Sequence, residues 1–404
     1  MNGVQRLAEL PSLKEISEII LAEGRAGQLI LFSIPDWDIW NKWREYLLQA
    51  LKNRLLERGE ETFWQTLQAD TIQDNPHELI CDYLALPQPA GQDELLTAPA
   101  NEQPLIIELD CGGKSLGNGW RDFIVRTARY FRVSDSVHSC RCICIFVLSP
   151  AELPPVPTDA GLRCFAFWNP LRWEEARLIA ADAVQEHDNV LARAWQISSY
   201  SGAANADPDI LARLTRNVPQ SLREIREQLN SCRKQKSSSP NVPTAAKRFY
   251  TELRWNVPAG LVDIWLGGCL LGNTLDRGAI IPWNRVSEKK FDKILNRSVW
   301  REQVAGLFPL LMEITYYVAE EVTRRKGDSW KRYLGGNNEY KAISEPGDIL
   351  TVFHRHRYQL GRLPDKLYNL LQQLRKVRNK LAHLEPVDLH EVNQIWRLFQ
   401  QIQK

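Results

Sequence analysis

The chain has 404 residues, enough for two or three domains that each bury a core of their own. Hydrophobic residues make up 44% and charged residues 25%, which excludes a disordered chain or a fibre and is typical of globular proteins. No apolar stretch reaches the roughly 18 residues of a membrane span, and the N-terminus lacks a signal-peptide pattern, so we expect a soluble, cytoplasmic protein without membrane contacts.

The formal net charge of +2 is unevenly distributed. Residues 246–404 contain 26 Lys and Arg against 17 Asp and Glu, a balance of +9, whereas residues 1–245 contain 25 against 32, a balance of −7. A basic C-terminal part favours a polyanionic partner such as RNA.

The first part of the chain alternates strand and helix patterns. Short apolar runs predict four strands: Gln28–Ile34, Pro104–Leu109, Arg141–Leu148 and Arg163–Trp168. Helical spacing of apolar residues predicts four helices: Leu13–Glu23, Trp40–Arg58, Glu174–Glu186 and Leu222–Leu229. Near-continuous apolar strands separated by helices predict an α/β domain with a mostly parallel sheet.

A polar stretch, Arg233–Thr244, contains three serines and two prolines and predicts a linker. We therefore expect an α/β domain at 1–232, a linker at 233–245 and an all-α region at 246–404. A second predicted loop, Gln88–Pro104, is rich in Pro, Ala and acidic residues and interrupts the first domain.

The predicted strand order resembles an AAA or STAND-type P-loop NTPase core. QLILFSI is the first strand of this resemblance, PLIIELD the Walker B-like strand and CICIFVLS the sensor strand, and residues 207–229 are the helical lid. Phosphate binding needs Gly-x-x-x-x-Gly-Lys-[Ser/Thr] after the first strand, but residues 33–40 read SIPDWDIW there, with neither glycine nor lysine.

The other two candidate elements of a nucleotide site, a Gly-Lys-Ser tripeptide and a Walker B acid, also depart from the required motifs. Gly113-Lys114-Ser115 follows the wrong strand and has Glu108 where the motif requires glycine. Asp110 is a candidate Walker B remnant, but Cys111 follows it instead of a catalytic acid. We therefore predict a degenerate NTPase-like domain without ATPase activity.

Two groups of residues are alternatives for metal binding. Cys140, Cys142 and Cys144 alternate on one face of a predicted strand next to His138, but zinc sites seldom take three ligands from one strand. Asp36 and Asp38, next to Trp37 and Trp40, are the other alternative. Buried free thiols in a reducing cytosol are favoured, and we expect no metal and no cofactor.

From about residue 246 the pattern is almost wholly helical. Three helices are predicted: Val299–Arg325, which Pro309 either kinks or splits in two, Leu363–Leu384 and Leu389–Ile402. Lys326–Asp348 is rich in glycine and asparagine and predicts a loop. The apolar, glycine-containing segment Leu261–Arg285 has no assignment.

Residues 374–388 read LRKVRNKLAHLEPVD, with Arg378 followed by polar Asn379 and then by His383. This block resembles the C-terminal Arg-x4-His signature of HEPN domains, small four- or five-helix bundles common in bacterial toxin and defence systems. Flanking residues also resemble the family: Leu381, Ala382, Leu384 and Pro386. The resemblance implies a HEPN-like bundle at about 290–404 with RNase activity or, as in inactive members, a binding or assembly role.

The resemblance also implies roles that suit the residue types. Metal-independent RNA cleavage uses the ribose 2′-OH as nucleophile, and a histidine such as His383 can move the proton. Arg378 can hold two phosphate oxygens as negative charge builds. Asn379 precedes His383 by four residues, so it shares a helix face and can orient the imidazole.

One copy of the motif makes an incomplete site. Arg378 and His383 are five residues apart, which is about 140° around a helix, so they flank a face instead of converging on it. Two copies related by a two-fold axis would bring both arginines and both histidines together, as in active family members. We therefore predict a homodimer through the C-terminal helices.

Five further cations are weaker candidates for RNA contacts. Arg355 and Arg357 lie in the basic, aromatic stretch FHRHRYQLGR, for which a solvated face is the alternative. The remaining three lie close to the motif: Arg375, Lys376 and Lys380.

These features lead to one hypothesis and one alternative. The hypothesis is an effector of a prokaryotic defence or toxin system, in which an inactive NTPase-like domain senses or docks a partner and a HEPN domain cleaves or binds RNA. The alternative is a non-enzymatic adaptor that assembles with partner proteins of a defence complex.

Overall fold

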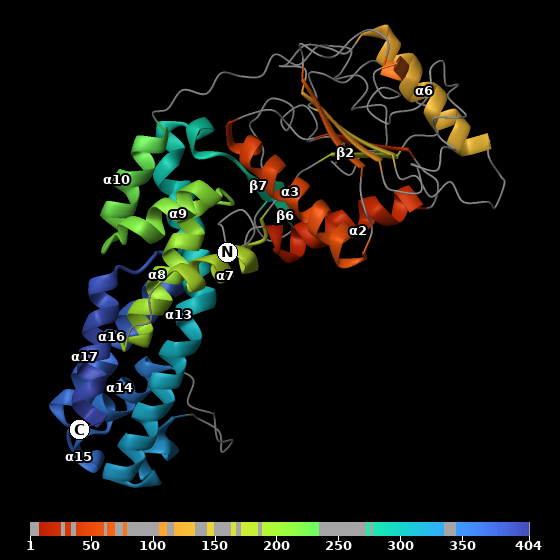
Figure 1. Ribbon diagram of the computed structural model, residues 1–404. Helices are drawn as coiled ribbons and strands as arrows, with labels where there is room; N and C mark the ends of the chain where they lie inside the picture. The colour runs from red at the N-terminus through yellow and green to blue at the C-terminus, as the bar shows by residue number, and fades with distance from the viewer. Residues whose placement is uncertain are drawn as a thin grey trace. The chain divides into compact units, whose positions relative to one another are not determined.

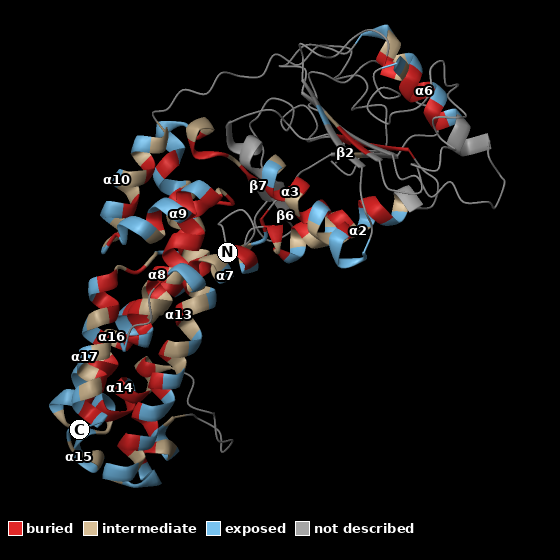
Figure 2. Ribbon diagram, viewed as in Figure 1, coloured by how far each residue is buried: buried red, intermediate tan, exposed pale blue. Residues whose placement is uncertain are grey.

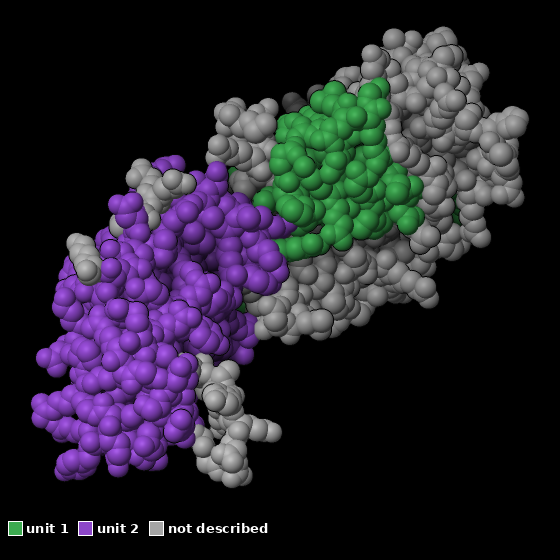
Figure 3. Space-filling view, turned by 90° about the horizontal axis from the view of Figure 1, so that it is seen from below, with its two compact units in different colours: residues 1–172, 237–282 green, residues 173–236, 283–404 purple. Residues whose placement is uncertain are grey.

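The computed structural model describes residues 8–25, 29–33, 38–59, 63–68, 76–78, 105–110, 117–133, 144–148, 163–166, 171–184, 188–233, 272–274, 278–334 and 345–403. The chain forms two compact units (Figure 3). Unit 1 contains residues 1–172 and 237–282, and unit 2 contains residues 173–236 and 283–404.

Unit 1 contains a five-stranded sheet, whose strands are β1 (Ile30–Ser33), β2 (Phe63–Gln68), β3 (Leu105–Asp110), β4 (Cys144–Leu148) and β5 (Arg163–Ala166). The strand order is β2-β3-β4-β1-β5, and each neighbouring pair is parallel. Strand β1, which lies between β4 and β5, is buried because helices cover the sheet on both sides.

Among the described residues of unit 1, three helices cover this sheet: α2 (Pro11–Arg25), α3 (Asp38–Glu57) and α6 (Asn118–Val133). α2 and α3 lie on one side of the sheet and α6 lies on the other (Figure 1). The buried face of α6 repeats at helical spacing through Trp120, Phe123, Ile124, Thr127 and Ala128. A short antiparallel hairpin, β6 (Gly272–Thr274) and β7 (Gly278–Ile280), also belongs to unit 1.

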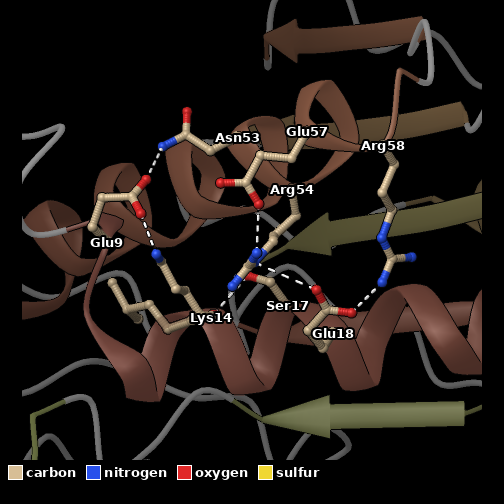
Figure 4. Close-up of polar contacts among 9 residues, drawn as sticks. Glu9, Lys14, Ser17, Glu18, Asn53, Arg54, Glu57 and Arg58 are labelled. Carbon is tan, nitrogen blue, oxygen red and sulfur yellow. Dashed lines mark hydrogen bonds and ion pairs between the residues drawn. The ribbon is translucent and has the colours of Figure 1, made fainter.

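Carboxylates on α2 and just before it hold α2 against α3 (Figure 4). Glu9 is paired with Lys14 and accepts a hydrogen bond from Asn53 Nδ2 at 2.9 Å, and its pKa is lowered chiefly by the Lys14 hydrogen bond. Glu18 is paired with two arginines near the end of α3, Arg54 and Arg58.

A further ion pair attaches α3 to the sheet. Arg44 Nε donates to Glu108 Oε1 at 2.9 Å, and Thr66 of β2 donates to the other oxygen of Glu108 at 3.1 Å. Glu108 of β3 is therefore bonded to both α3 and β2.

All the secondary-structure elements that the structure describes in unit 2 are helices, joined by turns and short irregular segments. Its elements are α7 (Trp173–Ala183), α8 (Val190–Ala204), α9 (Pro208–Asn217), α10 (Leu222–Arg233), η3 (Trp283–Arg285), α13 (Glu288–Lys326), η4 (Asp328–Tyr333), α14 (Pro346–Arg355), α15 (Arg357–Leu360), α16 (Asp365–Ala382) and α17 (Leu389–Gln403). None of the described helices in either unit is long and apolar enough to cross a membrane.

The core of unit 2 forms where α8 packs along α13. Eleven of the 15 residues of α8 are buried (Figure 2). A Cβ added to Gly202 would lie 2.8 Å from both Ser298 O and Val299 Cα, so only glycine allows this close approach. Gly306 of α13 similarly faces Ser198 of α8.

α13 is one continuous helix of 39 residues, about 58 Å long. Pro309 lies within it, so the alternative of two separate helices is wrong. The helix ends at Gly327, whose φ of 72° suits a residue without a Cβ.

The predicted fold class and boundaries need correction. Helices make up most of the described chain, and the α/β arrangement ends at residue 172 instead of 232, because α7 to α10 pack with the later helices of unit 2. The region at 246–404 is not all-α, because β6 and β7 lie in it and residues 237–282 belong to unit 1. Of the predicted linker at 233–245, the structure describes Arg233 alone, as the last residue of α10.

Several predicted features lie outside the described residues. These are the loop Gln88–Pro104, the tripeptide at 113–115, and the side chains of Asp36, Asp38, His138, Cys140, Cys142 and Cys144.

Candidate functional site

Helix α16 carries the Arg-x4-His motif at its C-terminal end. One face of the helix is buried at helical spacing against α13, α14 and α17 through Leu367, Leu370, Leu371, Leu374, Val377 and Leu381. Apolar packing therefore fixes α16, and the motif residues lie off the buried face.

The helix ends within the motif. His383 is the C-cap residue, and its backbone N–H donates to the carbonyls of Asn379 and Lys380, each at 3.0 Å. Leu384 follows with a φ of 63°, and Glu385 N–H donates to Lys380 O at 2.9 Å, the long bond of a Schellman motif. His383 therefore lies at the end of the helix, where its side chain is exposed.

The turn after His383 is attached to two other helices. The side-chain amide of Gln303 on α13 donates to Val387 O at 2.9 Å and accepts from Val387 N–H at 2.7 Å. Trp195 Nε1 on α8 also donates to Val387 O, at 2.7 Å, and Trp300 Nε1 on α13 donates to Leu381 O at 2.6 Å. These contacts, most of them buried, hold the end of the motif in a defined position.

Arg378 is paired with a carboxylate of its own unit. Its Nη2 contacts Oε1 of Glu345, the residue that precedes α14, and its side chain is 27% exposed. Its Nη1 donates weakly to Asn379 Oδ1 at 3.4 Å. The guanidinium is accessible, but Glu345 occupies part of its hydrogen-bonding capacity.

His383 is exposed, and the structure shows no hydrogen bond or ion pair of its imidazole with any described residue. The hydrogen bond between His383 and Asn379 joins backbone atoms, and the amide of Asn379 faces Arg378 instead. The described residues also show no hydrogen bond between Arg378 and His383. One copy therefore presents the two groups separately.

The lysines next to the motif are engaged by α17. Lys376 and Lys380 both pair with buried Glu391, at 3.3 and 2.8 Å. Glu391 also accepts from Asp388 N–H at 3.2 Å, which is one half of a capping box at the start of α17. Burial raises the pKa of Glu391, but the bonds from Lys380, Asp388 and Lys376 outweigh it and leave the pKa below 4.5.

The three predicted RNA-contacting arginines lie in two places. Arg375 is exposed on α16, and its side chain lies near Gly347 in the first turn of α14. Arg355 and Arg357 lie at the other end of α14, exposed and without an ion pair to any described residue.

No family model matches the sequence, and no curated protein matches it either. Among the described residues, no group of three or more His, Cys, Asp and Glu side chains is arranged to hold a metal ion. The candidate site therefore stands on the motif and on the geometry around it.

Proposed function

We propose that unit 2 is a HEPN-type module that binds and cleaves RNA without a metal, and that Arg378 and His383 carry the chemistry. The exposed imidazole of His383, held at the end of α16 by the Gln303–Val387 bonds, is the observation that supports this proposal most. A rigid backbone with a free imidazole suits proton transfer from a ribose hydroxyl.

The proposal includes a homodimer that completes the site. Arg378 and His383 are not joined within one copy, and a two-fold axis near the end of α16 would bring two of each together. Leu384 supports a contact surface there, because this apolar residue is 62% exposed. Its φ of 63° also lies in the left-handed region, which residues with a β-carbon seldom adopt.

For unit 1 we propose a sensing or docking role in an AAA or STAND-like fold without ATP hydrolysis. The order β2-β3-β4-β1-β5 supports this resemblance, because it places the sensor strand between the Walker B-like strand and the first strand. Four residues, 34–37, connect β1 to α3, whereas the phosphate-binding motif needs six from its first to its second glycine. We place the protein in the cytoplasm, in a prokaryotic defence or toxin system.

The experiment is RNA cleavage by the full-length protein in EDTA. Arg378→Ala and His383→Ala should each lower the cleavage rate by about a hundredfold or more, while the melting temperature of His383→Ala stays close to that of the wild type. Equal degradation by the wild type and both variants would indicate a contaminating nuclease and would refute the proposal.

The Arg378–Glu345 pair favours the second candidate, an adaptor without catalysis, because it gives Arg378 a structural role. Glu345→Gln separates the two functions. A catalytic Arg378 should retain cleavage in this variant, because its guanidinium becomes more available to phosphate. If Arg378→Ala and Glu345→Gln destabilise the protein equally and no variant cleaves RNA, the adaptor is the better assignment.

A further inference from the structure

A second basic surface lies at the end of α16 opposite the motif. We call it the tip and define it as residues 320–334 and 354–366. Trp330 joins its parts: it is fully buried, donates from Nε1 to Thr323 Oγ1 at 3.1 Å and packs against Phe353. Tyr333 stacks on His356 with ring centroids 4.0 Å apart, which brings η4 to the junction of α14 and α15.

The tip has an excess of positive charge that its own carboxylates do not neutralise. It contains nine Lys and Arg against four Asp and Glu. Glu321 pairs with Arg324 and Arg325, and Asp328 pairs with Lys331. Within the described part of the chain, six tip cations have no ion pair and are exposed or half-exposed: Lys326, Arg332, Arg355, Arg357, Arg362 and Lys366.

Aromatic rings lie among these cations. Tyr358 is 100% exposed and lies in the chain between Arg357 and Arg362, and the stacked Tyr333 is 40% exposed. Exposed rings among unpaired arginines are what single-stranded nucleic acid recognition uses, because bases stack on the rings and arginines contact phosphates. A duplex keeps its bases stacked and offers the rings no such contact.

We propose that the tip is an anchoring site for single-stranded RNA, with Arg355, Arg357 and Arg362 on backbone phosphates and Tyr358 on a base. This inference rests on the proposed function, because it assigns the substrate of the same module. Arg378 lies 13 residues beyond Asp365 on α16, about 20 Å along the helix. A strand anchored at the tip is long enough to extend to the motif once it contains several nucleotides.

The test measures binding of a short fluorescent 2′-O-methyl oligouridylate by fluorescence anisotropy over a series of salt concentrations. This probe lacks the 2′-OH nucleophile, so cleavage cannot interfere, and binding is measurable whether or not the motif is active. The variants are R355A/R357A/R362A and Tyr358→Ala in the full-length protein. The matched control, K289A/K290A/K293A, removes three exposed cations from the N-terminal part of α13.

The triple tip variant should weaken binding at moderate salt at least tenfold and lower the slope of log affinity against log salt by about two. Tyr358→Ala should weaken binding about tenfold without changing that slope. Unchanged affinity and slope in the triple tip variant, or an equal loss in the lysine control, would overturn the proposal.

Cleavage of unmodified RNA distinguishes this inference from the proposed function. Tip binding that persists in Arg378→Ala and His383→Ala, with no cleavage by any protein, would support the tip and refute the nuclease. Cleavage that depends on His383, with oligouridylate binding insensitive to the tip variants, would support the nuclease and refute the tip.

Discussion

Single side chains determine how the motif is presented, and most of their partners are distant in the sequence. Gln303 bonds to Val387 across 84 positions, and Arg378 pairs with Glu345 across 33. The residue pattern predicted where Arg378 and His383 lie, but no local pattern encodes contacts between separate helices. The sequence therefore did not identify Trp195 and Gln303, whose side chains bond to Val387 in the turn after His383. The one hint in the sequence is that each is a side chain with a hydrogen-bonding group among apolar residues.

Gly202→Ala should destabilise the protein, because the new Cβ would meet the backbone of α13 at 2.8 Å and neither helix can move without losing its packing. We expect a loss of about 1–3 kcal/mol in the free energy of unfolding, measured by urea denaturation. Gly347→Ala is the control: the nearest atom to its Cβ is 3.7 Å away, so stability should be unchanged or slightly higher. Equal stability of the two variants would contradict the close α8–α13 packing.

At the scale of elements, amphipathic and apolar patterns predicted β1, α3, α10, α13, α16 and α17 within a few residues, except that α13 begins 11 positions earlier than expected. α8 was not predicted, because a helix that is buried on nearly all sides has no polar face to mark its period. β2 was also missed, since its alternating sequence FWQTLQ is short and contains polar residues. Burial of nearly the whole helix decided the case of α8, and pairing with β3 decided the case of β2.

Glu391 gives a prediction for the start of α17. Its folded pKa is below its ordinary value of 4.5, so its ionised form stabilises the fold above that pH, and this contribution is lost as the pH falls below about 4.5. Glu391→Gln retains an acceptor for the capping box but removes the charge that Lys376 and Lys380 contact. The wild type should therefore melt at a higher temperature than Glu391→Gln at pH 7, and the difference should shrink with acidification. A difference independent of pH would contradict the ion-pair assignment.

At the scale of the whole molecule, the two units are interleaved in sequence. The chain leaves unit 1 at residue 172, forms α7 to α10 in unit 2, returns at residue 237 and enters unit 2 again at residue 283. A polar stretch marks a loop, but it does not show which elements pack together, so the sequence could not predict this division. A fragment of residues 246–404 would lack α8 and much of the core around α13, so self-association has to be tested with the full chain.

Leu384 tests that self-association. If a two-fold contact at the end of α16 completes the site, Leu384→Glu would place two like charges near the axis and should weaken both the dimer and RNA cleavage. Leu178→Glu on α7 is the matched control, because both leucines are 62% exposed. Sedimentation velocity of the full-length proteins over a wide concentration range should show a dimer for the wild type and the control, and a monomer for Leu384→Glu at the same concentrations. A wild type that stays monomeric while it cleaves RNA would refute the composite site, because one copy leaves Arg378 and His383 unconnected.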